Sequence, residues 1–591
     1  MNRKKLITIL GILLLSMSCK GPQKADEPCF TYTNPILHLD YSDPDVCRVG
    51  EDYYMTASSF NCFPGLPILH SRDLVHWEQV GAALKDYPDD AFRHSVQHGN
   101  GVWAPAIRYH DGWFYIYVGD PDRGIFMVRA QDPAGEWEKP VWVVREKGFI
   151  DPCPLWDDDG KAYLSHALAG SRAGLKSVVL VAPLSADGTR LEGQSKIVFD
   201  GHLTQPTIEG TKFYKRGTYY YIFAPAGGVA TGWQTVLRSK SPWGPFEEKV
   251  VMAWAPGTIN GPHQGAWVHA VDGSDWFIHF QDKGAYGRIV HLQPMNWTDN
   301  DWPVIGEDPD GDGVGQPIMG YTRPSGPRYD KGCHTERSER ISEIGLDFSW
   351  QFPAVPEATW QMVLPEGGIR LYSVEQEPGT LWNCRNVIQQ KFPAERFTVQ
   401  ARLSFRPNPQ LTGETAGFVV MGSDYAGLFL VGAPEGTALQ YRKCHEAGKG
   451  GQEEIIGLET IPYSCEKQVF PYASANVPAV NYPDRPEAEL WVKLEVRPKS
   501  VEGNVPDAVC RFYWSRDGNR WNKMPESFTA RPELWIGAKF GFFCNRYAHK
   551  NDAGWLDVTE LRIKPEYAPL DPRGSQSHRG LCTLKAPDTP L

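Results

Sequence analysis

"DPCPLWDDDGKAYLS", residues 151–165, is one of five similar phrases in the first half of the chain. Each phrase consists of a strand pattern, a glycine turn and a second strand pattern rich in aromatic residues, which is typical of a β-hairpin. The other four are residues 42–57, 103–118, 209–223 and 263–280. Their turn glycines lie 48 to 62 residues apart, a spacing that fits propeller blades of four short strands. The sequence therefore predicts a five-bladed β-propeller.

One polar or aromatic residue stands 7 to 10 residues before each turn glycine. In chain order these residues are Asp43, Trp103, Asp151, Glu209 and His263. If each phrase opens a blade, they begin the strands nearest the propeller axis and converge at one end of it. The repeat thus predicts a pocket that contains three carboxyl groups, a tryptophan and a histidine.

The composition fits an all-β protein of more than one domain. A chain of 591 residues is too long for a single core. Its 58 Gly, 48 Pro, 21 Trp, 25 Tyr and 26 Phe favour short strands and many turns. A formal charge of -11 speaks against a nucleic-acid partner, because phosphates require a basic surface.

Changes in pattern divide the chain. The repeats predict a propeller over residues 31–323, and the charged, irregular residues 324–341 fit a linker. Residues 342–566 alternate apolar and polar side chains without the hairpin phrase, which predicts a β-sandwich. Residues 567–591 form a polar tail.

The N-terminus has the pattern of an export signal. Residues 1–5 are basic, residues 6–15 are apolar but too few to span a bilayer, and residues 16–19 resemble a bacterial lipoprotein box. We expect a lipoprotein signal over residues 1–19, a spacer over 20–30, and a lipid on Cys19 that tethers an exported protein to a membrane. An ordinary cleaved signal that removes Cys19 is the alternative, and periplasm and cell surface both stay open.

The cysteines do not form a metal or disulfide pattern. Twelve are present, and eleven remain without Cys19; none forms a CxxC pair or a Cys/His cluster with zinc-like spacing. One or two bridges in the C-terminal half stay open. Cys153, beside Asp151, is expected to be a buried thiol rather than a nucleophile. The stretch "DPDGDGVG", residues 308–315, lacks the glutamate of a calcium loop and is interpreted as a turn, with an ion site as the alternative.

The three acids suit the hydrolysis of a glycosidic bond. One carboxylate must take a proton from water, and one carboxylic acid must protonate the departing oxygen. A third carboxylate nearby raises the pKa of the acid, because like charges resist joint ionisation. Asp43, Asp151 and Glu209 supply this set. Each alone could be an ordinary loop acid. All three, however, stand at a similar distance before a turn glycine, which favours a shared site.

These motifs resemble a known family. The order "SDPDV", "DPCPLWDDDGKAYL" and "EGTKFYKRGTYYYIF" resembles glycoside hydrolase family 43, whose five-bladed propellers cleave arabinose or xylose from plant polysaccharides with inversion. The stretch "SSFNCFPGLPILHSRDLVHWEQVG", residues 58–81, resembles its β-xylosidase and α-L-arabinofuranosidase branch. The motifs "GFVVMGSDYAGLFL" and "WIGAKFGFF" resemble the concanavalin A-like jelly roll that follows many of these propellers.

The resemblance implies catalytic roles. Asp43 matches the general base, Glu209 the general acid, and Asp151 the residue that tunes the pKa of the acid. No cofactor is required. His263 matches a histidine that in some members meets a calcium ion indirectly in the central channel; a structural histidine is the alternative.

The resemblance also implies three other substrate contacts besides His263. Trp103 matches an aromatic wall, with core packing as the alternative. Arg288 matches an arginine that grips sugar hydroxyls, with a surface salt bridge as the alternative. Phe60 matches an aromatic residue near the terminal sugar.

One departure concerns the substrate. Asn61 and Cys62 stand where close relatives carry bulky aromatic residues, which leaves open whether xylose or arabinose is accepted. The expected function is an inverting, exo-acting hydrolase that removes terminal α-L-arabinofuranosyl or β-D-xylosyl residues from hemicellulose or pectin side chains. A non-catalytic carbohydrate-binding lipoprotein is the alternative. The sandwich is expected to wall the active site rather than to act as a separate sugar-binding module.

Overall fold

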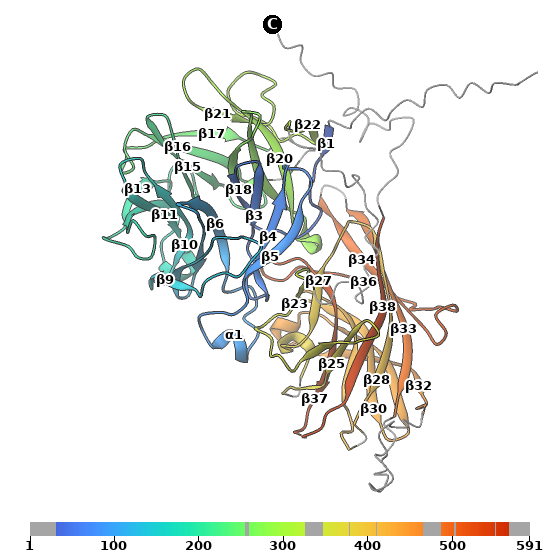
Figure 1. Ribbon diagram of the computed structural model, residues 1–591. Helices are drawn as coiled ribbons and strands as arrows, with labels where there is room; N and C mark the ends of the chain where they lie inside the picture. Colours follow the sequence, from blue (N-terminus) through green and yellow to red (C-terminus); the bar gives the residue numbers. More distant parts are fainter. Residues whose placement is uncertain are drawn as a thin grey trace, which may run out of the picture.

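A computed structural model describes residues 31–254, 259, 261–325, 347–377, 379–408, 410–464, 486–501, 504–549 and 551–566. The signal with Cys19, the spacer, the tail and most of the linker lie outside these residues. Within them the chain is all-β and forms two domains side by side (Figure 1). The described helices are all too short to cross a membrane.

The first domain is the predicted five-bladed propeller. Each blade is an antiparallel sheet of four strands that follow one another in sequence. Blades 1 and 2 comprise β2 (Asp45–Val49), β3 (Asp52–Thr56), β4 (Gly65–Ser71), β5 (Glu78–Leu84), β6 (Trp103–His110), β7 (Trp113–Asp120), β8 (Gly124–Ala130) and β9 (Val141–Val144). Blades 3 and 4 comprise β10 (Phe149–Trp156), β11 (Ala162–Leu168), β12 (Val178–Leu184), β13 (Lys196–Asp200), β14 (Lys212–Arg216), β15 (Tyr219–Ala226), β16 (Trp233–Ser239) and β17 (Glu247–Met252). Blade 5 comprises β18 (His263–His269), β19 (Asp275–Asp282), β20 (Arg288–Trp297) and β21 (Pro303–Ile305).

The repeat glycines occupy the first hairpin turn of every blade. Gly50, Gly112, Gly160, Gly217 and Gly273 all have positive φ, between 57° and 84°. Glycine suits these tight turns because it has no Cβ to clash in the left-handed region. The first strands of the blades, β18, β2, β6, β10 and β14, follow one another around the ring, and β18 also contacts β15. The residues at their starts therefore come together, as the repeat predicts.

The two ends of the propeller meet in a small sheet. Strand β1 (Thr31–Thr33) pairs antiparallel with β22 (Gly320–Thr322), and Tyr32 lies opposite Tyr321. Asn34 adds to this closure because its side chain donates to the main-chain oxygen of Leu292 in blade 5, at 2.8 Å. These contacts hold the ring of blades closed.

The second domain is a β-sandwich of two eight-stranded sheets. One sheet contains β23 (Trp350–Gln351), β26 (Val374–Glu375), β27 (Ile388–Lys391), β29 (Thr415–Met421), β30 (Tyr425–Ala433), β31 (Gly436–Cys444), β32 (Glu453–Ile461) and β37 (Lys539–Arg546). The other contains β24 (Gln361–Val363), β25 (Ile369–Tyr372), β28 (Phe397–Arg406), β33 (Ala488–Val501), β34 (Asn504–Ser515), β35 (Asn522–Lys523), β36 (Phe528–Thr529) and β38 (Trp555–Pro565). Alternate residues of β28 are buried in the core between the sheets, as the sequence pattern predicts.

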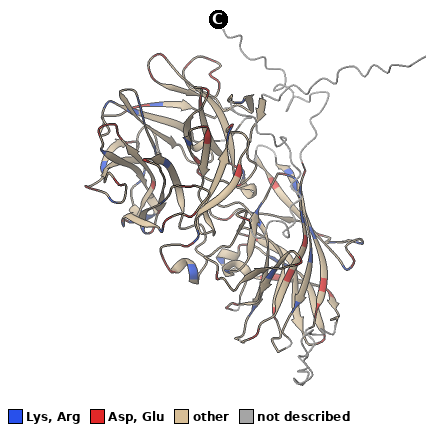
Figure 2. Ribbon diagram, viewed as in Figure 1, with Lys and Arg blue, Asp and Glu red and all other residues tan. Residues whose placement is uncertain are grey.

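Short helical turns lie between the strands. They are α1 (Ala91–His94), α2 (Gly170–Ala173), η1 (Gly284–Tyr286), η2 (Leu381–Asn383) and η3 (Ala447–Lys449). Basic and acidic residues are interspersed along both domains (Figure 2).

The sandwich packs directly on the propeller. Phe63 and Phe352 exchange two main-chain hydrogen bonds across the boundary, at 2.8 and 2.7 Å. Asp40 of the propeller accepts a hydrogen bond from the Gly537 N–H of the sandwich at 2.8 Å. The residues just before β37 are thereby fixed against the face of the propeller.

Candidate active site

The inner strands share a backbone feature at the end where the predicted residues stand. A residue with positive φ lies at the start of each one: Asp43 (54°), Ala104 (35°), Asp151 (57°), Gly210 (64°) and Gln264 (32°). Non-glycine residues rarely adopt such angles, and they concentrate at functional sites. In β6, β10 and β18 the pairing register also shifts at this point, which is typical of bulges that redirect side chains.

Asp43 is buried and held by three donors. Its Oδ2 accepts hydrogen bonds from the hydroxyls of Ser42 at 2.9 Å and Ser58 at 2.6 Å. Its Oδ1 lies 3.2 Å from Arg288 Nη1. A guanidinium and two hydroxyls suit an ionised carboxylate, which is the form that a general base needs.

Asp151 connects blade 3 to blade 4. Its Oδ2 accepts a hydrogen bond from the Gly210 N–H at 2.6 Å, and its main-chain oxygen accepts one from Thr211 Oγ1 at 2.8 Å. Burial raises the pKa of Asp151 to about 6, and the charge of Asp43 adds to the shift. These bonds hold Asp151 beside the residue that precedes Gly210, which is Glu209.

The surroundings of Glu209 favour its protonated form. Burial raises its pKa to about 8, and the charges of Asp151 and Asp43 contribute further. Arg288 acts in the opposite direction but does not cancel the shift. The side chain of Glu209 still keeps 33% of its surface exposed, so a bound molecule can reach the carboxyl group.

His263 stands next to Glu209 as a neutral ring. Its Nε2 lies 3.7 Å from Glu209 Oε1. Burial, with Arg288 adding, lowers the pKa of His263 to about 3. Neither ring nitrogen has a hydrogen-bond partner among the described residues. A neutral ring places no positive charge against Glu209.

The role of His263 toward calcium stays a prediction. Calcium prefers oxygen ligands, so this imidazole would face the ion through water, as the resemblance implies. Its two unpartnered ring nitrogens fit such a water-mediated contact.

Arg288 is a buried residue of the site, not a surface salt bridge. Its main-chain N–H donates to Asp40 Oδ1 at 2.8 Å, and its Nη1 donates to Ser42 Oγ at 2.6 Å. Its guanidinium lies 4.7 Å from the ring centre of Phe280 and 5.3 Å from that of Trp535. The arginine therefore connects the carboxylate of Asp43 to an aromatic side chain of the sandwich.

Trp103 and Phe60 lie on another side of the same region. The Trp103 ring is half-buried, and its Nε1 donates to the Gly99 main-chain oxygen at 2.7 Å. Phe60 is buried with Cys62 and Ile536, and Trp103 packs against this group. Phe60 therefore supports the tryptophan and keeps little surface of its own for a sugar.

Trp535 was not among the candidate residues, although it opens the motif "WIGAKFGFF". It comes from the sandwich, is 41% exposed, and has a φ of 69°, which is strained for a tryptophan. Its ring meets the edge of Trp103 at 6.2 Å between centres. A cavity of about 240 Å³ lies between the domains here, lined by Asp282, Gly284, Gly287 and Arg288 of the propeller and by residues 532–536 of the sandwich.

Asn61 and Cys62 are buried at the domain boundary. The Asn61 side chain donates to the Pro353 main-chain oxygen at 2.8 Å and accepts from the Gly99 N–H at 2.8 Å. The Cys62 sulfur contacts Lys539 of the sandwich. These two residues join the domains.

Cys153 is a structural thiol, as expected. It is fully buried, its Sγ lies 2.9 Å from Arg108 Nη2, and burial raises its pKa. All seven cysteines in the described part of the chain are free thiols. The bridges left open for the C-terminal half therefore do not form among Cys384, Cys444, Cys510 and Cys544.

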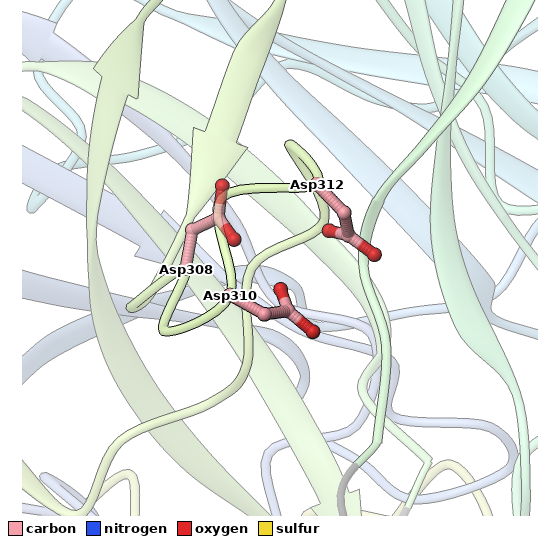
Figure 3. A group of neighbouring side chains, drawn as sticks. All are labelled: Asp308, Asp310 and Asp312. Atoms are coloured by element: carbon pink, nitrogen blue, oxygen red, sulfur yellow. The ribbon is translucent and has the colours of Figure 1, made fainter.

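The loop of residues 308–315 has the hydrogen bonds of a turn. The Asp308 carboxylate accepts from the Gly311 and Gly313 N–H groups, both at 2.9 Å. Side-chain oxygens of Asp308, Asp310 and Asp312 lie within 4.8 Å of one another (Figure 3). This cluster lies at the surface between β21 and β22, and the ion site stays only an alternative.

Comparisons with known proteins agree with this geometry. Residues 32–303 match the family model described as Glycosyl hydrolases family 43. Residues 342–564 match the model described as Beta xylosidase C-terminal Concanavalin A-like domain. A putative beta-xylosidase of Xylanibacter ruminicola is 38% identical over 519 residues, which cover 86% of each chain. The chain belongs to glycosyl hydrolases family 43.

Two further proteins show the same resemblance. A non-reducing end alpha-L-arabinofuranosidase of Bacteroides ovatus is 33% identical over 414 residues, covering 67% of this chain and 74% of the relative. A solved xylan beta-1,4-xylosidase of Bacillus halodurans shares the fold, with a TM-score of 0.73 and 22% identity over 90% of this chain and all of that one. Membership in family 43 makes the chain a glycosidase.

Proposed function

We propose that this family 43 glycosidase is an inverting, exo-acting hydrolase that removes terminal α-L-arabinofuranosyl or β-D-xylosyl residues from plant hemicellulose or pectin side chains. The observation that carries the mechanism is the contrast between two carboxyl groups. Asp43 is surrounded by donors that suit a carboxylate. Glu209 has its pKa raised to about 8, so it keeps its proton at neutral pH.

In the proposed reaction Asp43 takes a proton from a water molecule, and the oxygen of that water attacks the anomeric carbon. Glu209 gives its proton to the departing glycosidic oxygen as the bond breaks. Asp151 tunes the pKa of Glu209, because its charge disfavours ionisation of that acid. Arg288 orients Asp43 and is available to sugar hydroxyls. These steps use side chains alone, and a calcium ion in the channel would have a structural role.

The exo action is inferred from the position of the sandwich. Trp535 and Trp103 meet edge to face, and the segment of residues 532–536 covers the side of Arg288. A pocket closed on one side admits a chain end more readily than the middle of a polymer. The printed names of the relatives, a putative beta-xylosidase and an alpha-L-arabinofuranosidase, support xylose or arabinose as the terminal sugar.

The direct test uses 4-nitrophenyl α-L-arabinofuranoside and 4-nitrophenyl β-D-xyloside with the purified protein. We expect release of nitrophenol from at least one of them, and its loss in Asp43→Asn. A panel of arabinans, arabinoxylans and xylo-oligosaccharides then identifies the natural substrate. Binding of these glycans without any release would favour the carbohydrate-binding lipoprotein instead.

We further propose that the enzyme is exported and held at a bacterial membrane by a lipid on Cys19. The basic and apolar residues that precede a lipoprotein-like box support this location. Cys19→Ala should release the protein from the membrane fraction without changing its specific activity.

A further inference from the structure

A buried contact across the domain boundary lies outside the proposed catalytic residues. Lys539 Nζ, at the start of β37, lies 2.8 Å from Cys62 Sγ, and the two residues are 477 positions apart in the chain. Each is only 4% exposed. Cys62 belongs to the Asn61–Cys62 pair, at which this chain departs from the branch that it resembles.

The surroundings of the sulfur are apolar. Phe60 and Ile536 pack against Cys62 in one cluster. On the sandwich side, Lys391 of β27 lies directly opposite Lys539 of β37 in the sheet. Burial lowers the pKa of Lys391 to about 8, and the charge of Lys539 adds to this shift.

Lys539 differs from Lys391 because of the thiol. Burial lowers the pKa of Lys539, but Cys62, Asp40 and Glu533 raise it, and the net shift is upward. The Lys539 ammonium thus stands beside the Cys62 sulfur. A thiolate is the reactive form of cysteine toward peroxide.

We propose that Cys62 and Lys539 form a modification site, where hydrogen peroxide generates an S–N bond that joins the propeller covalently to the sandwich. A separation of 2.8 Å places the two atoms as close as groups poised to react. The product is a sulfenamide between a cysteine sulfur and a lysine nitrogen.

The reaction proceeds in two steps. The Cys62 sulfur reacts as a thiolate: it attacks peroxide and breaks the O–O bond, loses two electrons and becomes a sulfenic acid. The departing hydroxide takes a proton from the Lys539 ammonium and leaves as water. Lys539 is left as the free amine, the form that burial favours. Its nitrogen attacks sulfur, the S–O bond breaks, and a second water leaves. Ammonium, thiolate and one peroxide thus give a sulfenamide and two waters, and one hydrogen stays on nitrogen.

The cross-link would form beside the cavity between the domains. The cavity between the domains is lined by Ile536, which also packs against Cys62. Lys539 follows Ile536 by three residues, so the bond would fix the segment of residues 532–536 that carries Trp535. The modification would therefore hold the sandwich wall beside Arg288.

The test treats the full-length protein with hydrogen peroxide, digests it under non-reducing conditions and analyses the peptides by mass spectrometry. We expect a linked pair containing Cys62 and Lys539, two hydrogens lighter than the separate peptides and lost after reduction by a thiol. Oxidation should also raise the thermal unfolding midpoint of the wild type. Neither change should occur in Cys62→Ser or in Lys539→Arg, whose guanidinium is a poor nucleophile.

Cys153 is the matched control, because it is also buried beside a cation, Arg108, but faces no amine at bonding distance. It should form no linked peptide. Separate peptides with Cys62 as a free thiol or as a sulfinic or sulfonic acid would overturn the proposal. A linked pair that has gained an oxygen would contradict the S–N bond, and a link that persists in Lys539→Arg would contradict the assignment of the amine.

Discussion

His263 Nε2 lies 3.7 Å from Glu209 Oε1, and the histidine side chain is buried while that of Glu209 is partly exposed. The pKa of His263 is lowered to about 3, so the ring is neutral wherever the enzyme is folded at ordinary pH. A protonated histidine at this distance would favour the ionised form of Glu209. The neutral ring instead leaves Glu209 under the influence of burial and two nearby carboxyl groups. Glu209 therefore keeps its proton for two reasons. The nearby carboxyl groups disfavour a further negative charge, and the His263 ring carries no positive charge that would favour ionisation.

The first prediction concerns the pH dependence of Asp151→Asn. In the wild type kcat/KM should fall as pH rises through the Glu209 pKa of about 8, because the protonated acid is lost. Removing the charge of Asp151 lowers that pKa, so the alkaline limb should move to lower pH by on the order of 1 unit. Glu247→Gln, on the outermost strand of the same blade as Glu209, is the control. An alkaline limb that does not move in Asp151→Asn would contradict the role of Asp151.

The second prediction concerns Glu209→Gln and the leaving group. Loss of a general acid should reduce kcat/KM on natural oligosaccharides by about 10²–10⁴-fold. The reduction on nitrophenyl glycosides should be much smaller, because nitrophenolate leaves without a proton. Both rates are measured on the same enzyme preparation. An equal loss on the two kinds of substrate would show that Glu209 does not protonate the leaving oxygen.

The same variant should be more stable than the wild type at neutral pH. The pKa of Glu209 rises from an ordinary value of 4.5 to about 8 on folding. Between these values the unfolded state has lost the proton and the folded state has kept it, so stability decreases as pH rises through this window. Gln removes this dependence. Chemical denaturation should give an advantage of about 1–2 kcal/mol for Glu209→Gln at pH 8 and almost none at pH 4. An advantage that is independent of pH would contradict the raised pKa.

Arg288→Lys tests how Asp43 is positioned. Lysine keeps the positive charge but loses the planar group that contacts Ser42, Asp43 and the Trp535 ring. We expect kcat/KM to fall by about 10²-fold through misplacement of the base, with little change in the thermal midpoint. Arg123→Lys, whose guanidinium pairs with Asp89 and Asp120 elsewhere in the propeller, should keep full activity. Full activity of Arg288→Lys would exclude the positioning role.

Trp535→Ala tests the contribution of the sandwich. The ring borders Arg288 and Trp103, so its loss should weaken binding of a terminal sugar and raise KM by about 10-fold. Arg531→Ala is the matched control, because Arg531 directly precedes the cavity-lining segment, is exposed and does not line the cavity. Its KM should stay near that of the wild type. Equal effects of the two substitutions would indicate a general loosening of the segment.

Much of the site could be predicted because its residues stand at equivalent positions in successive blades of the propeller. The glycine turns fix the phase of each blade, and Asp43, Asp151 and Glu209 keep a common phase against them. Trp535 has no fixed offset from a turn glycine, because it belongs to the sandwich. It reaches the site only because one domain packs on the other. The contact of Cys62 with Lys539 could not be predicted from the sequence for the same reason. Local patterns do not report which loop of a second domain meets the first.

The backbone of the inner strands shows another limit. Positive φ at Ala104 and Gln264 is not indicated by residue type, since neither is a glycine or an asparagine. The surrounding propeller imposes these angles, and they become visible only in the folded chain.

The most direct test of the account is the anomeric configuration of the first sugar released, followed by proton NMR in the first minutes of the reaction. Attack by a water that Asp43 activates, with protonation by Glu209, predicts inversion: α-xylose first from a β-xyloside, or β-arabinose first from an α-arabinofuranoside. Product that first appears with the configuration of the substrate would indicate a covalent intermediate and would contradict the roles proposed for both residues.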